Sequence, residues 1–197
     1  MNDDRAPAAG ERDPDWELLA RVARGDEGAF APFVARHEAR LLRLCERLLG
    51  EVEEARDAAQ EVFLRAFRHA GRVEPRGQVF TWLYRVATNH CFNRLRRRRV
   101  VRFFSLSRDP ESDEPALDPP DGAAGPETAL AARARWRATR RAIDALPENQ
   151  RAVLVLAKFE GLSYREIAAT LGITEGAVES RLVRAMRRLT AAQEEAG

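Results

Sequence analysis

A run rich in proline and acidic residues, at positions 103–129, divides the chain into two halves that both show helical periodicity. The run holds five prolines, two glycines and seven acidic residues. It therefore has too little apolar surface to offset the entropy lost on ordering. We predict a flexible acidic linker here rather than a loop inside one domain. Fully extended, its ~27 residues would span about 90 Å, which would let the two halves bind sites far apart.

In both halves apolar residues recur at three- and four-residue intervals, which is typical of helices with one buried face. The pattern predicts helices at 29–49, 54–69, 78–98, 130–146 and 148–160, and Asp13-Pro14 predicts the start of an earlier one. No segment alternates with period two for long, so the predicted fold is all-α, with two small helical domains. The predicted boundaries are a disordered tail (1–13), a first domain (14–102), the linker (103–129), a second domain (130–190) and a tail (191–197).

Composition excludes several classes of protein. An apolar share of 45% in 197 residues argues against wholesale disorder. Two cysteines are too few for a disulfide scaffold, and no Cys/His cluster has the spacing of zinc ligands. No apolar run is long enough to span a membrane, and the polar N-terminus does not resemble a signal peptide. We expect a cytoplasmic protein with no metal, no cofactor and no membrane insertion.

The distribution of charge points to a polyanionic partner. Between Arg76 and Arg102 there are eight arginines and no acidic residue, whereas the linker is strongly acidic. On the predicted helix 78–98, Arg85, Asn89 and Asn93 follow at four-residue steps and so share one face. Arginine binds phosphate, and asparagine can pair with base edges. The alternative is that the arginines only solvate a helix end.

Trp82 lies one turn before Arg85 and could stack on an unpaired base. It could equally belong to the core together with Tyr84, which is the more ordinary role of such residues. The choice between these two roles stays open.

The sequence SYREIAATLGITEGAVESRLVRAMRRL, from Ser163, predicts a helix-turn-helix. Ser163 and Glu166 match a capping box, Gly172 permits the sharp turn, and Thr174 can cap the second helix. Small Ala168 would let the two helices cross closely. A plain helical hairpin is the alternative.

Catalytic chemistry finds little support. His37, His69 and His90 are scattered, and His37 and His90 fall on or beside apolar stripes, where we expect satisfied core histidines. Cys45 and Cys91 also fall on predicted buried faces and are interpreted as small hydrophobic residues. A metal or redox site at His90 and Cys91 is the alternative. Neither a phosphate-binding loop nor a nucleophile elbow is present, so we predict that the chain is not an enzyme.

The order of the motifs resembles one family. DAAQEVFLRAF on one helix, FTWLYRVATNHCFNRLRRRR on the next, a linker, and then LPENQRAVLVLAKFEGLSYREIAATLGITEGAVESRLVRAMRRL are similar to the extracytoplasmic-function (group 4) sigma factors of the sigma-70 family. The resemblance covers residues ~16–190, and the two blocks match independently. It implies a protein that binds core RNA polymerase, directs it to particular promoters and helps to open them.

The resemblance also implies roles for particular residues. The face Asp57, Gln60, Glu61, Leu64 and Arg65 would bind the β′ clamp helices of the polymerase, although on the residues alone it is an ordinary solvated face. The −10 element would be bound by Arg76, Gln78, Trp82, Arg85, Asn89, Asn93, Arg96 and Arg97, with residues 74–79 in the segment that captures a flipped base. The −35 element would be read by Thr174, Glu175, Glu179, Ser180, Arg181 and Arg184. The β flap and an anti-sigma factor are further implied partners.

Glu179 departs from the family pattern, because a basic residue is common in relatives at that position. A carboxylate there can accept a hydrogen bond from cytosine N4 but is repelled by phosphate. Two other functions remain open at this point. One is a two-domain helix-turn-helix regulator that acts without core polymerase; the other is a nucleic-acid-modifying enzyme with an arginine-rich arm.

Overall fold

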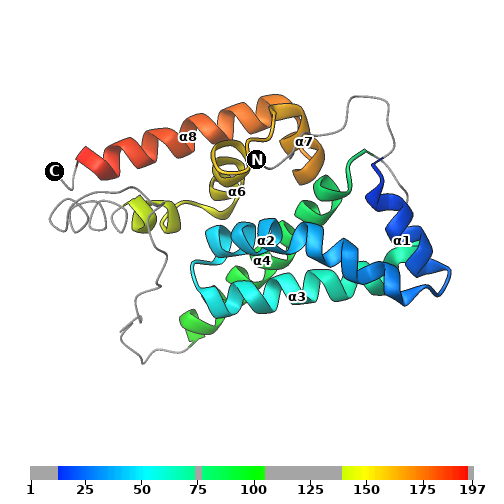
Figure 1. Ribbon diagram of the computed structural model, residues 1–197. Coiled ribbons are helices and arrows are strands. Elements are labelled where there is room, and N and C mark those ends of the chain that lie inside the picture. Colours follow the sequence, from blue (N-terminus) through cyan, green and yellow to red (C-terminus); the bar gives the residue numbers. More distant parts are fainter. Residues whose placement is uncertain (1–12, 74–76, 105–138, 195–197) are drawn as a thin grey trace, which may run out of the picture.

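The computed structural model describes residues 13–73, 77–104 and 139–194, which contain helices and turns but no strand. The N-terminal module comprises α1 (Asp15–Ala23), α2 (Phe30–Leu49), α3 (Val52–His69) and α4 (Val79–Phe104), with 3-10 turns at Glu27–Ala29 and Ala70–Arg72. The C-terminal module comprises a helical stretch at 139–144, then α6 (Glu148–Lys158), α7 (Tyr164–Leu171) and α8 (Glu175–Glu194). Figure 1 shows the C-terminal module lying along α2 and α4. The all-α fold is as predicted.

The observed helix boundaries stay close to the predicted ones. Helix α2 ends before Gly50 as predicted, and α3 begins two residues before the predicted position. The largest difference is at α4, which continues to Phe104, six residues beyond the predicted end and into the predicted linker. The rest of the linker and most of the tails lie outside the described residues, as do residues 130–138 of the predicted helix 130–146.

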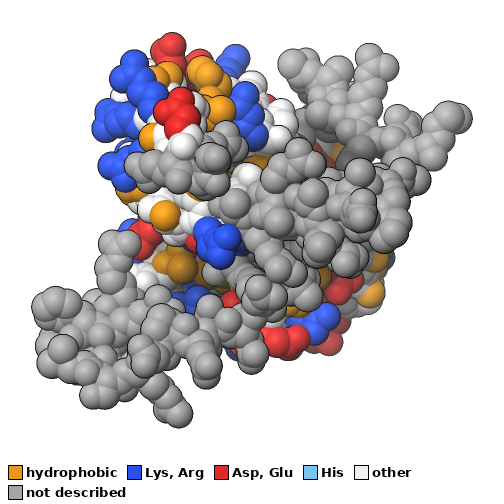
Figure 2. Space-filling view, turned by 90° about the vertical axis from the view of Figure 1, so that its left-hand side faces the viewer, with side chains coloured by type: hydrophobic (Ala, Val, Ile, Leu, Met, Phe, Trp, Pro, Cys, Tyr) orange, Lys and Arg blue, Asp and Glu red, His pale blue; other side chains and the backbone are white. Residues whose placement is uncertain are grey.

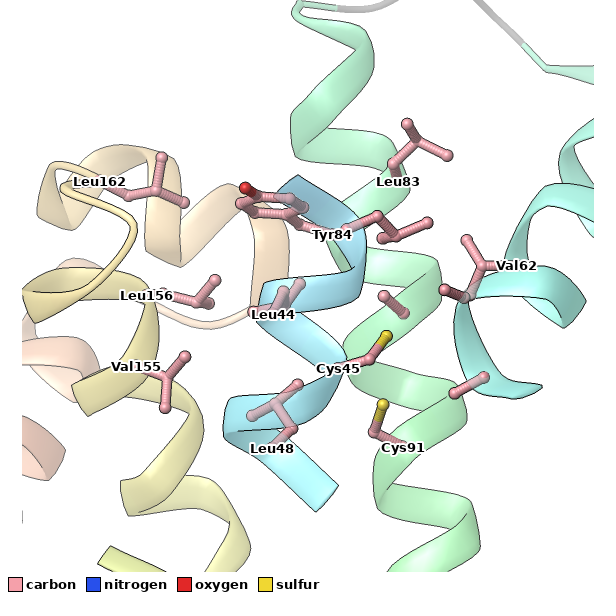
Figure 3. Close-up of a cluster of buried hydrophobic side chains, with 14 of the residues drawn as sticks. Leu44, Cys45, Leu48, Val62, Leu83, Tyr84, Cys91, Val155, Leu156 and Leu162 are labelled. Atoms are coloured by element: carbon pink, nitrogen blue, oxygen red, sulfur yellow. The ribbon is translucent and has the colours of Figure 1, made fainter. Parts of the chain in front are cut away.

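Aromatic rings fill the core of the N-terminal module. Phe30 and Phe33 of α2 meet Phe63 and Phe67 of α3, with ring centroids 5.1–6.4 Å apart. Edge-on contacts at these distances add to the burial of apolar area. Further along, the buried thiols of Cys45 on α2 and Cys91 on α4 face one another (Figure 3). The three long helices therefore bury the stripes that their periodicity predicts.

The hydrophobic core continues from one module into the other. Leu44 and Leu48 of α2 and Tyr84 of α4 point toward Leu156 of α6 and Leu162, which precedes α7 (Figure 3). All five are buried. The composition of the linker predicted two halves that can bind sites far apart. It did not predict that the two halves pack against one another. The packing is thus a structural finding in its own right.

Arginines from the C-terminal module complete the end of α2. Arg140 donates from Nη2 to the carbonyl oxygen of Glu46 at 3.0 Å, and Arg151 donates from Nη1 to that of Leu48 at 2.9 Å. The last carbonyls of a helix lack partners within the helix and carry partial negative charge, so guanidinium groups stabilise them. Gly50 closes α2 with φ +91°, and a Cβ there would lie 3.1 Å from Arg140 Nη2. The positive φ favours glycine here, and a larger residue would also push Arg140 away from the end of α2.

A buried carboxylate also joins the modules. The side chain of Glu160, just after α6, is 3% exposed. Its carboxylate accepts hydrogen bonds from Arg47 Nη1 and from the Tyr84 hydroxyl, both at 2.6 Å, and Arg40 Nε lies 3.5 Å away. Burial and the Glu160 carboxylate together raise the pKa of Tyr84, so the phenol stays protonated and donates.

Candidate nucleic-acid and polymerase interfaces

Helix α4 has a buried face and an exposed polar face. Leu83, Ala87 and Cys91 recur every four residues and so share one face of the helix. This face is buried against α2 and α3. The opposite face exposes Arg85, Asn89, Asn93, Arg96 and Arg97, five of the residues predicted to bind the −10 element. The structure therefore brings together an Arg–Asn surface about four turns long, which suits contact with a nucleic-acid strand.

Other arginines of α4 turn toward α3 instead. Arg94 Nη2 lies 3.2 Å from Asp57 Oδ2, and Arg98 forms ion pairs with Glu51 and Glu54. These contacts orient α3 and α4 relative to one another. Of the exposed arginines, Arg96 forms a loose pair with Glu148 of α6 at 3.5 Å, and its side chain stays 66% exposed. The basic run read from the sequence thus has two separate structural roles.

The remaining residues of the predicted −10 surface lie near the start of α4. Gln78 and Trp82 are half-buried, whereas Arg76 lies outside the described residues, as do positions 74 and 75 of the predicted base-capturing segment. The Trp82 ring packs against the ring of Trp16 on α1, with centroids 6.2 Å apart. Tyr84 is part of the core, as its ordinary role predicts.

The predicted polymerase-binding residues share one outer face of α3. Asp57, Gln60 and Leu64 are exposed, while Glu61 and Arg65 are half-buried and paired at 2.8 Å. The hydrogen bond from Arg65 lowers the pKa of Glu61 and keeps it ionised at neutral pH. Leu64 is one of the few large apolar side chains exposed among the described residues. A single exposed apolar side chain is common on protein surfaces, so the role of this face in polymerase binding stays a prediction.

The predicted helix-turn-helix forms as expected. Ser163 and Glu166 make the capping box of α7, Gly172 adopts φ +65° in the turn, and the Thr174 hydroxyl accepts a hydrogen bond from Ala177 N at 3.2 Å. Ile167, Val178 and Leu182 are buried between α7, α8 and α6. These contacts fix α8 at a set angle to α7, which a groove-binding helix needs.

Helix α8 presents the predicted −35 surface at its N-terminal end. Thr174, Glu175, Glu179 and Arg184 are exposed, and Ser180 and Arg181 are half-buried. Arg184 Nη2 donates to Ser180 Oγ at 2.6 Å. Further along α8, arginines alternate with the exposed Val183 and Met186. Figure 2 shows Lys and Arg side chains gathered at the upper end of the molecule, the level at which α8 lies in Figure 1.

The helix-turn-helix lies against the start of the α4 surface. A Cβ on Gly172 would stand 3.4 Å from Arg85 Nη2, and α7 packs beside α4. Arg85 is exposed on the polar face of α4 and also lies beside the turn of the other module. Asn89 and Asn93 are exposed further along the same face.

Of the two histidines expected to be satisfied in the core, His37 and His90, the structure gives a hydrogen-bond partner to the first. His37 is satisfied, because its Nε2 lies 2.8 Å from Asp15 Oδ2 and its ring packs on Phe33. The prediction was wrong for His90, whose buried Nε2 has no hydrogen-bond partner among the described residues. Burial and the neighbouring Arg65 lower the pKa of His90, which favours the neutral ring.

No group of three or more His, Cys, Asp or Glu side chains in the described part of the chain could hold a metal ion. Likewise, none of the helices within residues 13–73, 77–104 and 139–194 is long and apolar enough to cross a bilayer.

Three long-range contacts were not predictable from the sequence. Glu160 joins the modules, Asp13 binds the start of α4, and Trp16 donates to the Gly77 carbonyl. Each contact links residues more than 60 positions apart, so helical periodicity could not reveal it. Glu160 in particular follows a helix and precedes a glycine, as many solvated residues do.

The fold and its two polar surfaces define a helical DNA-binding protein with two binding modules. Family models agree: Sigma-70 region 2 matches residues 33–100, and Sigma-70, region 4 matches residues 136–189. The RNA polymerase sigma-H factor of Pseudomonas aeruginosa is 36% identical over 182 residues, covering 88% of this chain and 91% of the relative. The ECF RNA polymerase sigma factor SigM of Mycobacterium tuberculosis is 37% identical over 175 residues, covering 89% and 82%.

A solved structure shares the fold. The sigma factor RpoE of Bartonella quintana, determined in complex with the anti-sigma factor NepR, matches with a TM-score of 0.66 and 22% identity, over 84% of this chain and 96% of that one. The chain belongs to the sigma-70 family and, within it, to the extracytoplasmic-function RNA polymerase sigma factors. The resemblance stated from the sequence is confirmed.

Proposed function

We propose that the chain binds core RNA polymerase through α3, directs it to promoters through α4 and α8, and helps to open the DNA. The observation that carries this proposal is the Arg–Asn face of α4, on a helix whose other face is fully packed. A helix held this rigidly can present Arg85, Asn89 and Asn93 in a fixed line to one DNA strand.

The chemistry of α4 suits the −10 element in its open form. Unstacking a base costs a few kcal/mol, so the open strand needs contacts that duplex DNA does not offer. Asn89 and Asn93 can pair with exposed base edges, while Arg96 and Arg97 neutralise phosphates. These contacts favour the separated strand and so help to melt the duplex.

The chemistry of α8 suits duplex DNA. Its N-terminal end is exposed and capped, and a helix of this kind fits the major groove, where every base pair presents its own pattern of donors and acceptors. Glu179 is exposed and able to accept a hydrogen bond from cytosine N4. The −35 preference of this protein would then differ from that of relatives that have a basic residue at this position.

The outer face of α3 is the proposed site for the β′ clamp helices. Leu64 supplies an apolar contact, and Asp57, Gln60, Glu61 and Arg65 supply charged and polar partners around it. By family membership, the C-terminal module would bind the β flap, and an anti-sigma factor would compete for these same surfaces. No catalytic step is assigned to the chain, and its proposed place of action is the cytoplasm, where RNA polymerase works.

Binding both promoter elements at once requires the modules to separate. In the structure α7 lies against α4, whereas two DNA elements that are more than two helical turns apart are separated by roughly 70 Å or more. We therefore infer that the packed arrangement opens when the protein joins the polymerase and the promoter.

Reconstitution with bacterial core RNA polymerase tests the proposal. The wild-type chain should bind core and start transcripts at defined positions on a genomic DNA template. Asn89→Ala should lower initiation about tenfold without weakening core binding, because one base contact is lost. Asn149→Ala, an exposed asparagine on α6, is the matched control and should change nothing. Sequence-specific DNA binding without any association with core would instead support the two-domain regulator.

A further inference from the structure

Asp13 binds the start of two helices that are far apart in the sequence. One carboxylate oxygen accepts from Asp15 N of α1 at 3.0 Å, and the other accepts from Val79 N, the first residue of α4, at 2.9 Å. Asp13 itself is buried. The first N–H groups of a helix have no partner within the helix and are usually satisfied by the residue just before it. In α4 this role is taken by a carboxylate 66 positions earlier.

Trp16 makes a second contact with the same place. Its indole Nε1 donates to the carbonyl oxygen of Gly77 at 2.8 Å, and its ring lies against that of Trp82, one turn inside α4. Trp16 is buried, whereas Gly77 is exposed, so the tryptophan reaches from the core to the backbone at the surface. The two residues therefore hold the backbone on both sides of Gln78, one through a carbonyl and one through an amide.

Helix α1 is itself attached to α2, which makes it a rigid support. Asp15 forms an ion pair with Arg36 and a 2.8 Å contact with His37 Nε2, both on α2. Gly77 and Val79 are thus held in place by α2, through α1, as well as by the chain on either side of them.

We propose that Asp13 and Trp16 are positioning residues for promoter opening: they hold Gly77, Val79 and the first turn of α4 in the geometry that receives the separated strand. The proposal rests on the proposed function. A site that captures an unstacked base gains most when it is ordered in advance, because ordering it during capture would subtract from the binding free energy. Two anchors that cross to another helix provide that order without touching the DNA.

Two variants test the role, each removing one anchor. Trp16→Phe removes the indole N–H and keeps an aromatic ring beside Trp82. Asp13→Asn removes the negative charge that favours a helix N-terminus and keeps the size of the side chain. Asp26→Asn is the matched control: its carboxylate lies before a short helix in the same module and pairs with Arg21, with no contact to Gly77 or Val79.

The assay compares two templates with holoenzyme reconstituted from bacterial core RNA polymerase. One template is a fully double-stranded promoter, and the other carries the same promoter with the −10 region already mismatched and open. Strand opening is followed by the fluorescence of 2-aminopurine in the −10 region. We expect both variants to open the duplex about tenfold more slowly than wild type, the effect of one hydrogen bond to a charged or buried group. With holoenzyme in excess, initiation from the open template should change less than about twofold, because that template needs no strand separation. Affinity for core should also stay within about twofold, because neither anchor lies on the face of α3 proposed to bind core.

Several outcomes would overturn the proposal. Equal losses on both templates would show that the anchors only support the fold, and unchanged opening by folded variants would show that they have no role. If Asp13→Asn does not fold, Trp16→Phe alone decides between these outcomes. Failure of the wild-type chain to bind core or open DNA would refute the proposed function itself, a result distinct from any difference between variants.

Discussion

Replacing Glu160 by glutamine should loosen the packing of the two modules. The carboxylate is 3% exposed and accepts short hydrogen bonds from Arg47 and from Tyr84. Glutamine keeps the size and one carbonyl oxygen but loses the charge and one acceptor. Its new NH₂ group would then face the guanidinium of Arg47 or the Tyr84 hydroxyl, and only the hydroxyl can accept from it.

The size of the effect follows from the exposure of the partners. Hydrogen bonds to charged groups contribute about 1.5–3 kcal/mol each, and breaking a fully buried pair costs about 3–5 kcal/mol. Arg40 and Arg47 are 30% and 28% exposed, so water can solvate them once the charge is gone. We therefore expect a loss of about 2 kcal/mol, which shifts the balance between packed and separated modules about 30-fold.

Small-angle X-ray scattering during a urea titration measures this shift. The radius of gyration of the Glu160→Gln variant should begin to rise at a lower urea concentration than that of wild type. Tyr84→Phe should lie between the two, because it removes one hydrogen bond and leaves the ion pairs intact. Opening should also free Arg85 from the turn at Gly172, so the variant should bind a single-stranded −10 oligonucleotide more tightly.

Glu148→Gln is the control for charge alone. Glu148 also pairs with a residue of the other module, Arg96, but at 3.5 Å and with Arg96 66% exposed. Such a pair is worth at most about 1 kcal/mol. If Glu160→Gln and Glu148→Gln shift the urea dependence equally, the buried carboxylate does not hold the modules together and the reasoning fails.

Three further predictions concern acid stability, thiol reactivity and promoter choice. Burial alone would raise the pKa of Asp15, but contacts with His37 and Arg36 outweigh it and hold the pKa below 3.8. Asp15 therefore stabilises the fold above that pH, and this stabilisation is lost on further acidification. Asp15→Asn should flatten the acid limb of the stability curve measured by circular dichroism. The contact with Cys45 and burial raise the pKa of Cys91, so a thiol reagent such as DTNB should react slowly with both cysteines in the native protein and fully in urea; rapid native reaction would contradict their burial. Glu179→Arg should change which −35 sequences are used in run-off transcription and leave core affinity unchanged, and an unaltered preference would refute the assigned contact.

The local features of the fold were predictable because they depend on residues close in sequence. The capping box of Ser163 and Glu166, the turn at Gly172 and the buried stripe of α4 all follow from spacings of three or four residues. The exposed faces of α3 and α8 also follow from helical spacing, and the resemblance to sigma factors implies what each face would bind. Their roles in binding stay predictions.

Contacts between distant segments were not predictable. Nothing near Glu160 distinguishes it from a solvated acid, and nothing near Asp13 shows that it caps a helix beginning at Val79. The same holds for Arg140 and Arg151, which in the sequence belong to an arginine-rich region and in the structure complete the last turn of α2. These pairings depend on how whole helices pack, and a single sequence carries no periodic signal for that.

The contacts that hold the modules together are largely separate from the surfaces proposed to bind DNA. Arg140, Arg151 and Glu160 bind the end of α2 and the buried side of α4, whereas Asn89 and Asn93 remain exposed. Each module also has its own caps and its own apolar contacts, so separation would expose the shared cluster around Leu156 without dismantling a helix. A packed arrangement of this kind can be exchanged for polymerase and promoter contacts as a rigid-body movement, with both DNA-binding surfaces already formed.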